Sequence, residues 1–443
     1  MNIAVIGTGY VGLVSGACFA EFGTRVTCID VDEPKVEALQ RGEVPIYEPG
    51  LDALVARNLA AGRLRFSTDL AGAVRDNLVL FITVGTPQDP HGRADLGSVL
   101  EVAGRIADVL CGYKVIVLKS TVPVGTGDRV EALIRERSGG RHPFSVASNP
   151  EFLREGAAIE DFMRPNRVVI GTEDEQSRAI LEDLYRPLYL IETPIVHTNR
   201  RTAELIKYAS NAFLAMKISF INEMADLADR VGADVHDIAR GMGLDRRIGR
   251  LFLHPGPGFG GSCFPKDTRA LIATGEEYGQ PMRLVRAAVE VNDARPAVMV
   301  EKIRNALGGE LAGTTVALLG LSFKPNTDDV RESPALKIAA ELVRSGARVR
   351  AFDPVAGDNA RAAGFEGELA PDEYRACEGA DAVVIATEWN QFRNLDLDRL
   401  GAALARKVMI DLRNVYEPDD LARLGFTYVA VGRPAAGGRE ARA

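Results

Sequence analysis

The sequence predicts an α/β protein of two doubly wound domains, joined by a helical central region that contains one long helix. Short apolar segments alternate with amphipathic ones near both ends of the chain. Residues 199–231 contain neither Pro nor Gly and form one uninterrupted helical pattern. The layout that begins with NIAVIGTGYVG returns later as TVALLGLSFK, and the second strand of each copy ends in an Asp, Asp30 or Asp353.

The predicted strands are nearly continuous in apolar residues, which is typical of a mostly parallel sheet buried on both faces. In the N-terminal part they are NIAVIG, RVTCID, LVLFITV, KVIVLKS, FSVAS, RVVIG and PIVH. In the C-terminal part they are TVALLGL, RVRAF, DAVVIAT, KVMIDL and TYVAV. The helix at 199–231 would span roughly 50 Å at ~1.5 Å per residue, and a second long helix is predicted at about 282–307 despite Pro296.

These elements divide the chain into four parts. The N-terminal domain covers residues 1–198, the helical central region 199–311 and the C-terminal domain 312–432. The last part, residues 433–443, is rich in Gly, Ala and Arg, and we expect it to be disordered.

Composition excludes several classes of protein. The net charge of −8 disfavours nucleic acid as a partner, because no basic surface is available to attract a polyanion. The N-terminus does not have the pattern of a signal peptide, and no apolar run reaches the ~18–20 residues of a membrane span. The five cysteines are scattered without a C-x-x-C pair, which argues against a metal site or a disulfide framework and favours a reducing cytoplasm.

A cofactor site is predicted at the first strand. Gly7, Gly9 and Gly12 form G-x-G-x-x-G between an apolar strand and a helix, which is the Rossmann-like pattern for binding a pyrophosphate at a helix N-terminus. Asp30 ends the second strand, where a carboxylate accepts hydrogen bonds from ribose hydroxyls and repels a 2′-phosphate, so NAD is favoured over NADP. The alternative is a mononucleotide site or a vestigial loop. Lys35 either reaches the same ribose or is a solvated helix lysine.

The long helix carries polar residues in apolar surroundings. Lys207 and Asn211 are four residues apart and therefore lie on one face, with Asn222 near that face about three turns on. Burying this pair without a function would be costly, which indicates a site. The alternative is a lysine at the helix edge whose stem covers apolar surface.

A cysteine lies at the predicted start of another helix. In GFGGSCFPKD, Pro265 suits the first helical turn, so Cys263 lies at or just before the N-terminus. The helix dipole and Lys266 would both favour the thiolate, which indicates a nucleophile rather than a small core residue. Loops that follow two strands of the first domain add Thr121, Glu151 and Glu155. Each of these residues either takes part in the chemistry or is a solvated side chain.

These segments together resemble the UDP-glucose/GDP-mannose dehydrogenase family. The resemblance covers nearly the whole chain and rests on GTGYVG, PIYEPGL, VGTP, STVPVGT, NPEFLREG, KYASNAFLAMKISFINE, RIGRLFLHPGPGFGGSCFPKD and GLSFKPNTDDVRESP. It implies NAD-dependent oxidation of a nucleotide sugar that the C-terminal domain helps to bind. Ser262 and the Lys266–Asp267 pair favour UDP-glucose, with GDP-mannose or another nucleotide sugar as the alternative.

The resemblance also implies roles for individual residues. Those around the reacting carbon would be Cys263 as nucleophile, with Lys207, Asn211, Asp267, Thr121 and Glu155. The NAD contacts would include Val11, Asp30, Lys35, Thr86, Thr121, Glu155, Lys266 and Arg331. The nucleotide sugar would be held by Phe152, Leu153, Arg154, Glu155, Lys207, Arg247, Phe252, Leu253, His254, Pro255, Gly256, Gly260 and Lys324.

The implied chemistry explains these residue types. Oxidising a primary alcohol to a carboxylate removes two hydrides from one carbon, hence two NAD. A base near the hydroxyl suits Asp267 acting through water, while Lys207 and Asn211 would stabilise the alkoxide. Cys263 would capture the aldehyde as a thiohemiacetal, and Glu155 would activate water against the resulting thioester.

Three other functions are less consistent with the sequence. A β-hydroxyacid dehydrogenase shares the glycine-rich domain and a long helix with Lys and Asn, but needs neither Cys263 nor a second α/β domain. A short-chain-type epimerase would need Tyr-x-x-x-Lys, which no tyrosine here begins. An NAD-responsive binding module would have no use for a thiol beside a lysine and two acids.

The long helix also predicts assembly. It is apolar on more than one face, with Ile206, Phe213 and Phe220 along one line and Leu205, Ile218 and Met224 elsewhere. A helix that is apolar nearly all round must be covered on every side, and a second copy related by a two-fold axis is the commonest cover. We therefore expect a homodimer built on this helix, as the family resemblance also implies.

Overall fold

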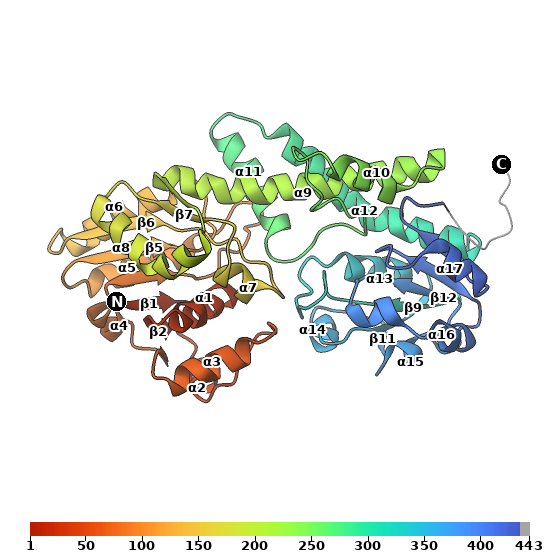
Figure 1. Ribbon diagram of the computed structural model, residues 1–443, viewed down its shortest axis with the longest axis horizontal. Helices are drawn as coiled ribbons and strands as arrows, with labels where there is room; N and C mark the ends of the chain where they lie inside the picture. The colour runs from red at the N-terminus through yellow and green to blue at the C-terminus, as the bar shows by residue number, and fades with distance from the viewer. Residues whose placement is uncertain (435–443) are drawn as a thin grey trace. The chain divides into compact units, whose positions relative to one another are not determined.

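The computed structural model describes residues 1–434, whose backbone forms two separate sheets (Figure 1). The chain divides into two compact units, the first made of residues 1–210 and 269–281 and the second of residues 211–268 and 282 onward. Two helices, α9 (Arg200–Val231) and α11 (Phe264–Glu277), contribute residues to both units. The predicted central region is therefore shared between the two units.

The first unit is built on an eight-stranded sheet with the order β3-β2-β1-β4-β5-β6-β7-β8. Every neighbouring pair is parallel except β6 and β7. The strands are β1 (Asn2–Ile6), β2 (Arg25–Ile29), β3 (Leu64–Ser67), β4 (Val79–Ile82), β5 (Lys114–Leu118), β6 (Phe144–Ser148), β7 (Val168–Gly171) and β8 (Ile195–Thr198).

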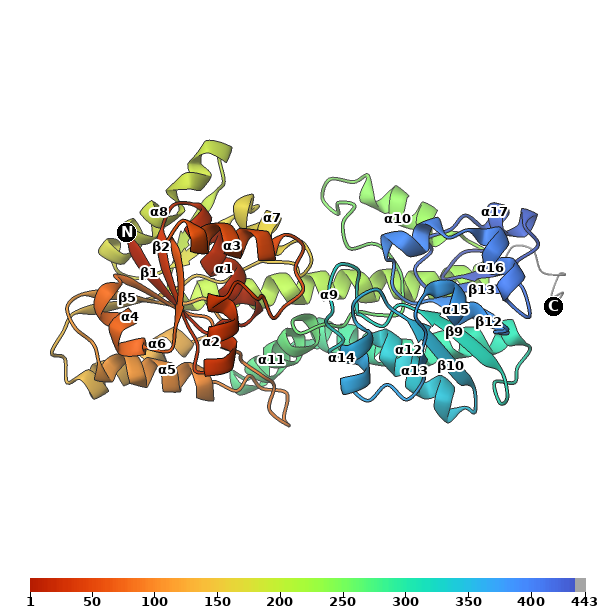
Figure 2. The same cartoon turned by 90° about the horizontal axis from the view of Figure 1, so that it is seen from below.

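Helices cover both faces of this sheet, as Figure 2 shows, because its central strands are apolar on both sides. One face packs against α1 (Tyr10–Glu21), α2 (Glu33–Gln40), α3 (Leu51–Ala60), α7 (Ala158–Met163) and α8 (Glu175–Tyr185). The other packs against α4 (Leu70–Asp76), α5 (Gly97–Asp108) and α6 (Thr126–Ser138). A short 3-10 helix, η1 (Arg186–Ile191), follows α8.

The second unit has a six-stranded parallel sheet with the order β11-β10-β9-β12-β13-β14. This order repeats that of the first six strands of the other sheet, so the predicted echo between the two ends of the chain is confirmed at the level of topology. The strands are β9 (Thr315–Leu319), β10 (Arg348–Phe352), β11 (Glu368–Leu369), β12 (Ala382–Ile385), β13 (Val408–Asp411) and β14 (Thr427–Ala430).

Two layers of helices enclose the second sheet as well. One core contains residues of α12 (Arg283–Leu307), α13 (Pro334–Arg344), α14 (Gly357–Ala362) and the C-terminal half of α9, and α10 (Val235–Gly243) packs against it. The opposite core contains residues of α15 (Glu373–Cys377), η2 (Asn390–Asn394), α16 (Leu397–Ala403) and α17 (Pro418–Arg423). The α/β fold class with one long helix is thus confirmed.

Several details go beyond the predicted elements. The edge strands β3 and β11 were not predicted, because the sequences LRFS and EL are too short and too polar to stand out from loops. Helix α12 runs through Pro296 as expected. Of the predicted tail, Arg433 is ion-paired with Asp234 and Glu417, while residues 435–443 lie outside the described residues. None of the described helices is long and apolar enough to cross a membrane.

Substituting Ala for Gly12 should destabilise the first unit. The added Cβ would lie 1.9 Å from Gly7 O and 2.6 Å from Thr83 Oγ1, so α1 would have to move away from β1. Overpacking of this kind costs about 1–3 kcal/mol, and the melting temperature should fall by several degrees. Gly9→Ala is the matched control, because no atom lies within 4 Å of its Cβ position and its φ is an ordinary −69°. Equal losses in the two variants would contradict this account.

Candidate functional site

The turn between β1 and α1 forms a ready cradle for a dinucleotide. Gly7 has a φ of 101°, Gly12 packs its backbone against Gly7, and Gly9 at the N-cap of α1 faces open space. A pyrophosphate placed there would meet the positive end of the helix dipole without a side chain in the way. The residues present therefore fit a nucleotide cofactor.

Asp30 is oriented by the same turn. Its Oδ2 accepts hydrogen bonds from Thr8 N at 2.8 Å and Thr8 Oγ1 at 2.6 Å, and from Lys35 Nζ at 3.0 Å. Burial alone would raise the pKa of Asp30, but these donors outweigh it and lower the pKa to about 2. Asp30 is therefore ionised at neutral pH, and the structure brings Lys35 to it.

The loops after β4 and β5 meet beside this turn at the carboxyl edge of the sheet. Thr86 is buried, and its Oγ1 donates to the backbone oxygen of Thr121 at 2.9 Å. The half-buried Val11 lies in the first turn of α1. These predicted cofactor residues thus gather at one end of the first sheet, whereas Lys266 and Arg331 belong to the second unit.

The loop after β6 holds a buried ion pair. Glu151 Oε1 lies 2.9 Å from Lys207 Nζ on α9, and both side chains are almost fully buried. Burial would raise the pKa of Glu151, but Lys207, the Leu153 N–H and Lys119 outweigh it and lower the pKa. Glu151 is therefore buried and ion-paired with a residue of α9 rather than solvated.

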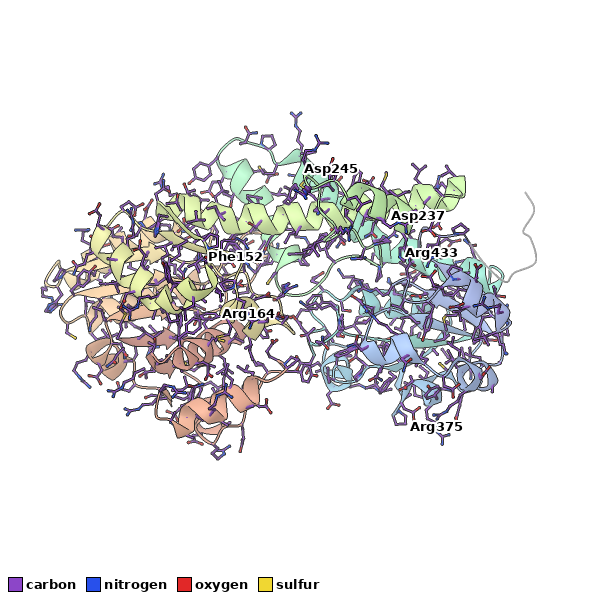
Figure 3. All side chains as sticks on the ribbon, viewed as in Figure 1. Phe152, Arg164, Asp237, Asp245, Arg375 and Arg433 are labelled. Atoms are coloured by element: carbon purple, nitrogen blue, oxygen red, sulfur yellow. The ribbon has the colours of Figure 1, made fainter. Side chains whose placement is uncertain are left out.

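The next residues of this loop are held by cation–π contacts and by a second ion pair. Phe152, labelled in Figure 3, has the Arg167 guanidinium 3.5 Å from its ring centroid and Lys207 Nζ 5.4 Å from it. Arg154 is paired with Asp161 at 2.7 Å, and the half-buried Glu155 and Leu153 lie on either side of it. Phe152 and Lys207, both predicted to contact the sugar, are thus brought together.

Two carboxylates that no sequence pattern predicts also hold these loops. Glu204, one turn before Lys207 on α9, accepts from Gly125 N at 2.7 Å and Gly127 N at 2.8 Å at the start of α6. Burial raises the pKa of Glu204 to about 7. Glu48 accepts from Gly156 N at 2.6 Å and Ala158 N at 2.8 Å, and also from the Tyr10 hydroxyl.

The second unit contains the predicted nucleophile. Cys263 directly precedes the first residue of α11, as predicted, and its Sγ lies 3.5 Å from Ser262 Oγ. One turn on, Asp267 is fully buried and its backbone N–H donates to Cys263 O at 2.8 Å. Its Oδ2 accepts from Asn211 Nδ2 at 2.6 Å, and its Oδ1 from Lys266 Nζ at 2.5 Å. Cys263, Asn211, Lys266 and Asp267 therefore form one constellation.

The glycine-rich loop before Cys263 is held by three polar side chains from neighbouring helices. Asn222 Oδ1 accepts from Gly256 N at 2.8 Å, and Arg295 donates to Gly256 O at 2.9 Å. Asn292 Oδ1 accepts from Phe259 N at 2.7 Å. Gly260 packs so closely on the backbone of Glu332 that a Cβ would lie 2.5 Å from its oxygen. The loop is therefore held by hydrogen bonds along its length and by close backbone packing at Gly260.

The remaining predicted substrate residues are distributed over this unit. Leu253, Pro255, Gly256 and Gly260 are buried, Phe252 is half-buried with a φ of 63°, and His254 is exposed. Lys324 Nζ lies 5.2 Å from the Phe323 ring, and Arg331 is paired with Asp329 at 2.7 Å. Arg247 is exposed and pairs with Asp245, labelled in Figure 3, so the structure does not bring it to the Cys263 constellation within this unit.

Comparison with known proteins identifies one family over most of the chain. The model of the NAD-binding domain of the UDP-glucose/GDP-mannose dehydrogenase family matches residues 1–189, that of the central domain 201–294, and that of the UDP-binding domain 317–418. The UDP-glucose 6-dehydrogenase of Rhizobium meliloti is 56% identical over 438 residues, covering 98% of this chain and all of that protein. The UDP-glucose 6-dehydrogenase TuaD of Bacillus subtilis is 48% identical over 99% of this chain and 95% of its own.

Solved structures give the same result. That of a UDP-glucose dehydrogenase from the archaeon Pyrobaculum islandicum superimposes with a TM-score of 0.90 at 43% identity and covers 98% of both chains. The resemblance noted in the sequence is therefore confirmed in all three of its domains. The chain belongs to the UDP-glucose/GDP-mannose dehydrogenase family and carries its NAD-binding domain.

Proposed function

We propose that this chain catalyses the NAD-dependent, four-electron oxidation of UDP-glucose to UDP-glucuronate. The observation that carries the proposal is Cys263 at the start of α11, with the buried Asp267 one turn on and bonded to Asn211 and Lys266. A dehydrogenase that stops at an aldehyde has no need of such a thiol. Gly7, Gly9, Gly12 and Asp30 would hold NAD at the first sheet, where it would supply a hydride acceptor for each of the two oxidations.

The first oxidation needs a base and an electrophile. Asp267 accepts the hydroxyl proton through a water molecule, while Lys207 and Asn211 stabilise the alkoxide that forms. The buried pairing of Lys207 with Glu151 supports this role, because it keeps an ammonium group charged in an apolar setting. Thr121, whose loop is fixed by Glu204, positions the water.

The second oxidation depends on the thiol. The Cys263 thiolate adds to the aldehyde carbon, and protonation of the oxygen gives a thiohemiacetal, whose tetrahedral carbon carries a hydroxyl group and the C–H bond from which the second hydride leaves. Loss of a hydride and a proton gives a thioester on Cys263. Glu155 takes a proton from water, the hydroxide displaces the thiolate, and the carboxylate product is released.

UDP-glucose is the substrate that the comparisons favour. Two relatives that are named UDP-glucose 6-dehydrogenase share 56% and 48% identity with the chain over nearly its full length. Phe152 to Glu155, Lys207, Phe252 to Gly256, Gly260 and Lys324 would hold the sugar nucleotide. GDP-mannose is the second candidate, because the family includes enzymes that are named for it.

The experiment measures NADH absorbance with UDP-glucose and GDP-mannose in parallel. We expect two equivalents of NADH per UDP-glucose, and little NADH with GDP-mannose. One equivalent, or a clear preference for GDP-mannose, would contradict the proposal.

Replacing the nucleophile tests the covalent step. Cys263→Ser should leave binding of both ligands largely intact and reduce kcat below about a tenth of the wild-type value, a loss of more than ~1.4 kcal/mol in transition-state stabilisation. Cys111→Ser is the matched control, because Cys111 is also half-buried and lies outside the site. Retention of more than a tenth of kcat in Cys263→Ser would rule out covalent capture.

Asp30 should enforce NAD over NADP. Its carboxylate remains ionised at neutral pH and would repel a 2′-phosphate. We expect kcat/KM to be at least tenfold higher with NAD, and Asp30→Ala to narrow the gap. Comparable values for the two cofactors in the wild-type chain would show that Asp30 does not face the ribose.

We further propose that the protein works in a reducing cytoplasm, because its cysteines form no disulfide.

We also propose that the chain forms a homodimer. Helix α9 exposes Phe213, Phe220 and Leu227, which recur every seventh residue and are 61%, 44% and 51% accessible. Such a stripe is normally covered by a partner. Ile206, Ile218 and Met224 are half-buried, so they contribute less to it than predicted, whereas Leu205 is exposed.

Light scattering at micromolar concentration should therefore give twice the 47.7 kDa mass of one chain. Phe213→Glu combined with Phe220→Glu should shift the mass to one chain, because two buried carboxylates would face the partner. Leu190→Glu, at a residue that is exposed on η1, is the control and should leave the mass unchanged. A wild-type monomer with full activity would refute the dimer.

A further inference from the structure

A buried lysine that the proposed chemistry does not use lies beneath the Glu151 loop. Lys119 directly follows β5 and its side chain is only 3% exposed. Its Nζ donates to Asn149 Oδ1 at 3.1 Å and to the Tyr185 hydroxyl at 3.3 Å. The rings of Phe81 and Phe162 lie 5.9 and 5.7 Å from it. A cation enclosed in this way is costly to bury unless it interacts with a negative charge.

The carboxylate that stabilises Lys119 is Glu151. Both side chains line one small cavity in the first unit, of about 50 Å³. Burial lowers the pKa of Lys119, and the charge of Glu151 offsets part of this effect. Burial would raise the pKa of Glu151, but Lys207 and the Leu153 N–H lower it, and the charge of Lys119 adds to their effect. Glu151 therefore interacts with two buried ammonium groups, Lys207 at 2.9 Å and Lys119 on the cavity side.

The remaining groups around Lys119 do not replace Glu151. Cys18 on α1 and Tyr185 on α8 have pKa values raised by burial, so both are neutral near pH 7. Arg167 also lines the cavity, but it is a cation. Asp161 on α7 lines it too and is paired with Arg154. Asn149 and the two rings carry no charge.

The network also fixes the backbone that carries Glu151. Asn149 immediately precedes the Pro150–Glu151 step, and its Oδ1 accepts from both Lys119 and the Tyr185 hydroxyl, the latter at 2.6 Å. Its Nδ2 donates to Val169 O at 2.8 Å on the neighbouring strand β7. Lys119 is therefore joined to Glu151 both through charge and through the start of its loop.

We propose that Lys119 is a positioning residue, which keeps Glu151 ionised so that Glu151 holds the Lys207 ammonium in its reactive place. This inference rests on the proposed function, in which Lys207 acts on the sugar. It adds to that function a second buried cation, which lets the Glu151–Lys207 ion pair persist as the pH falls.

The sign of the pH effect follows from the charges. Removing a cation raises the pKa of a neighbouring carboxyl group, so Glu151 would take up a proton at a higher pH in Lys119→Met. Burial lowers the pKa of Lys119 to about 8, so the wild-type chain itself loses this charge above that pH. The kcat of the variant should therefore fall below that of the wild type at low pH and approach it above pH 8.

The experiment measures kcat and KM for UDP-glucose between about pH 5 and 9. In Lys119→Met we expect the acidic midpoint of kcat to rise by about one pH unit, with KM little changed and with kcat above pH 8 within about twofold of wild type. Lys119→Arg keeps the charge and should keep the midpoint. If the methionine variant does not fold, Lys119→Gln carries the same expectation.

Two matched variants separate charge from structure. Lys114→Met removes a different buried lysine, the first residue of β5, which donates to Asn77 O at 2.7 Å and has no carboxylate partner among its described contacts. Tyr185→Phe removes a hydroxyl from the network without changing its charge. Neither should move the midpoint. A uniform fall in kcat at every pH in Lys119→Met, or an equal shift in Lys114→Met, would overturn the inference. A wild-type chain that forms no NADH from UDP-glucose would instead refute the proposed function.

Discussion

The buried polar side chains of α9 constrain the candidate site residues within each of the two units. Four of them face inward from one helix, and each must find a partner because a polar group left unpaired in a protein interior is costly. Glu204 binds the backbone at the start of α6, Lys207 binds Glu151, Asn211 binds Asp267, and Asn222 binds Gly256. Each partner lies in or beside a segment that carries a proposed catalytic or substrate residue. The partners that the buried polar side chains of α9 require therefore fix the segments that carry the proposed catalytic and substrate residues.

The same requirement sets the charge state of the site. Glu151 and Lys207 neutralise one another, and Asp267 is fully buried between an amide and an ammonium group. Breaking such a pair from one side leaves a buried charge, which typically costs about 3–5 kcal/mol. Substitution of either partner should therefore disturb folding as well as catalysis, and experiments on this site need matched controls for stability.

The sequence predicted the long helix, the main strands and the position of Cys263 at a helix start, because each has a local cause. Apolar runs define the strands, the absence of Gly and Pro defines α9, and Pro265 marks the first turn of α11. Lys119, Glu204 and Glu48 were missed for the opposite reason. Their partners are distant in sequence, as in the separation of 77 positions from Gly127 to Glu204, so no local spacing reveals them. A charged residue inside an apolar stretch, such as Glu204 in AELIK, was the available signal.

The two sheets show how one topology supports different chemistry. Asp30 and Asp353 occupy equivalent positions after the second strand of each unit. Asp353 Oδ2 accepts from Leu321 N, Ser322 N and Trp389 Nε1, and its Oδ1 from Val355 N and Ala356 N, so its acceptor capacity is used internally.

Asp30 is saturated at Oδ2, whereas its Oδ1 accepts only the Asp32 N–H, at 3.2 Å, among the described residues. A carboxylate oxygen has room for a second donor. Asp30 is thus able to accept a ribose hydroxyl, and Asp353 is not. A nucleotide bound by the second sheet must be recognised through other groups, which is consistent with the loss of the glycine triplet from TVALLGLSFK.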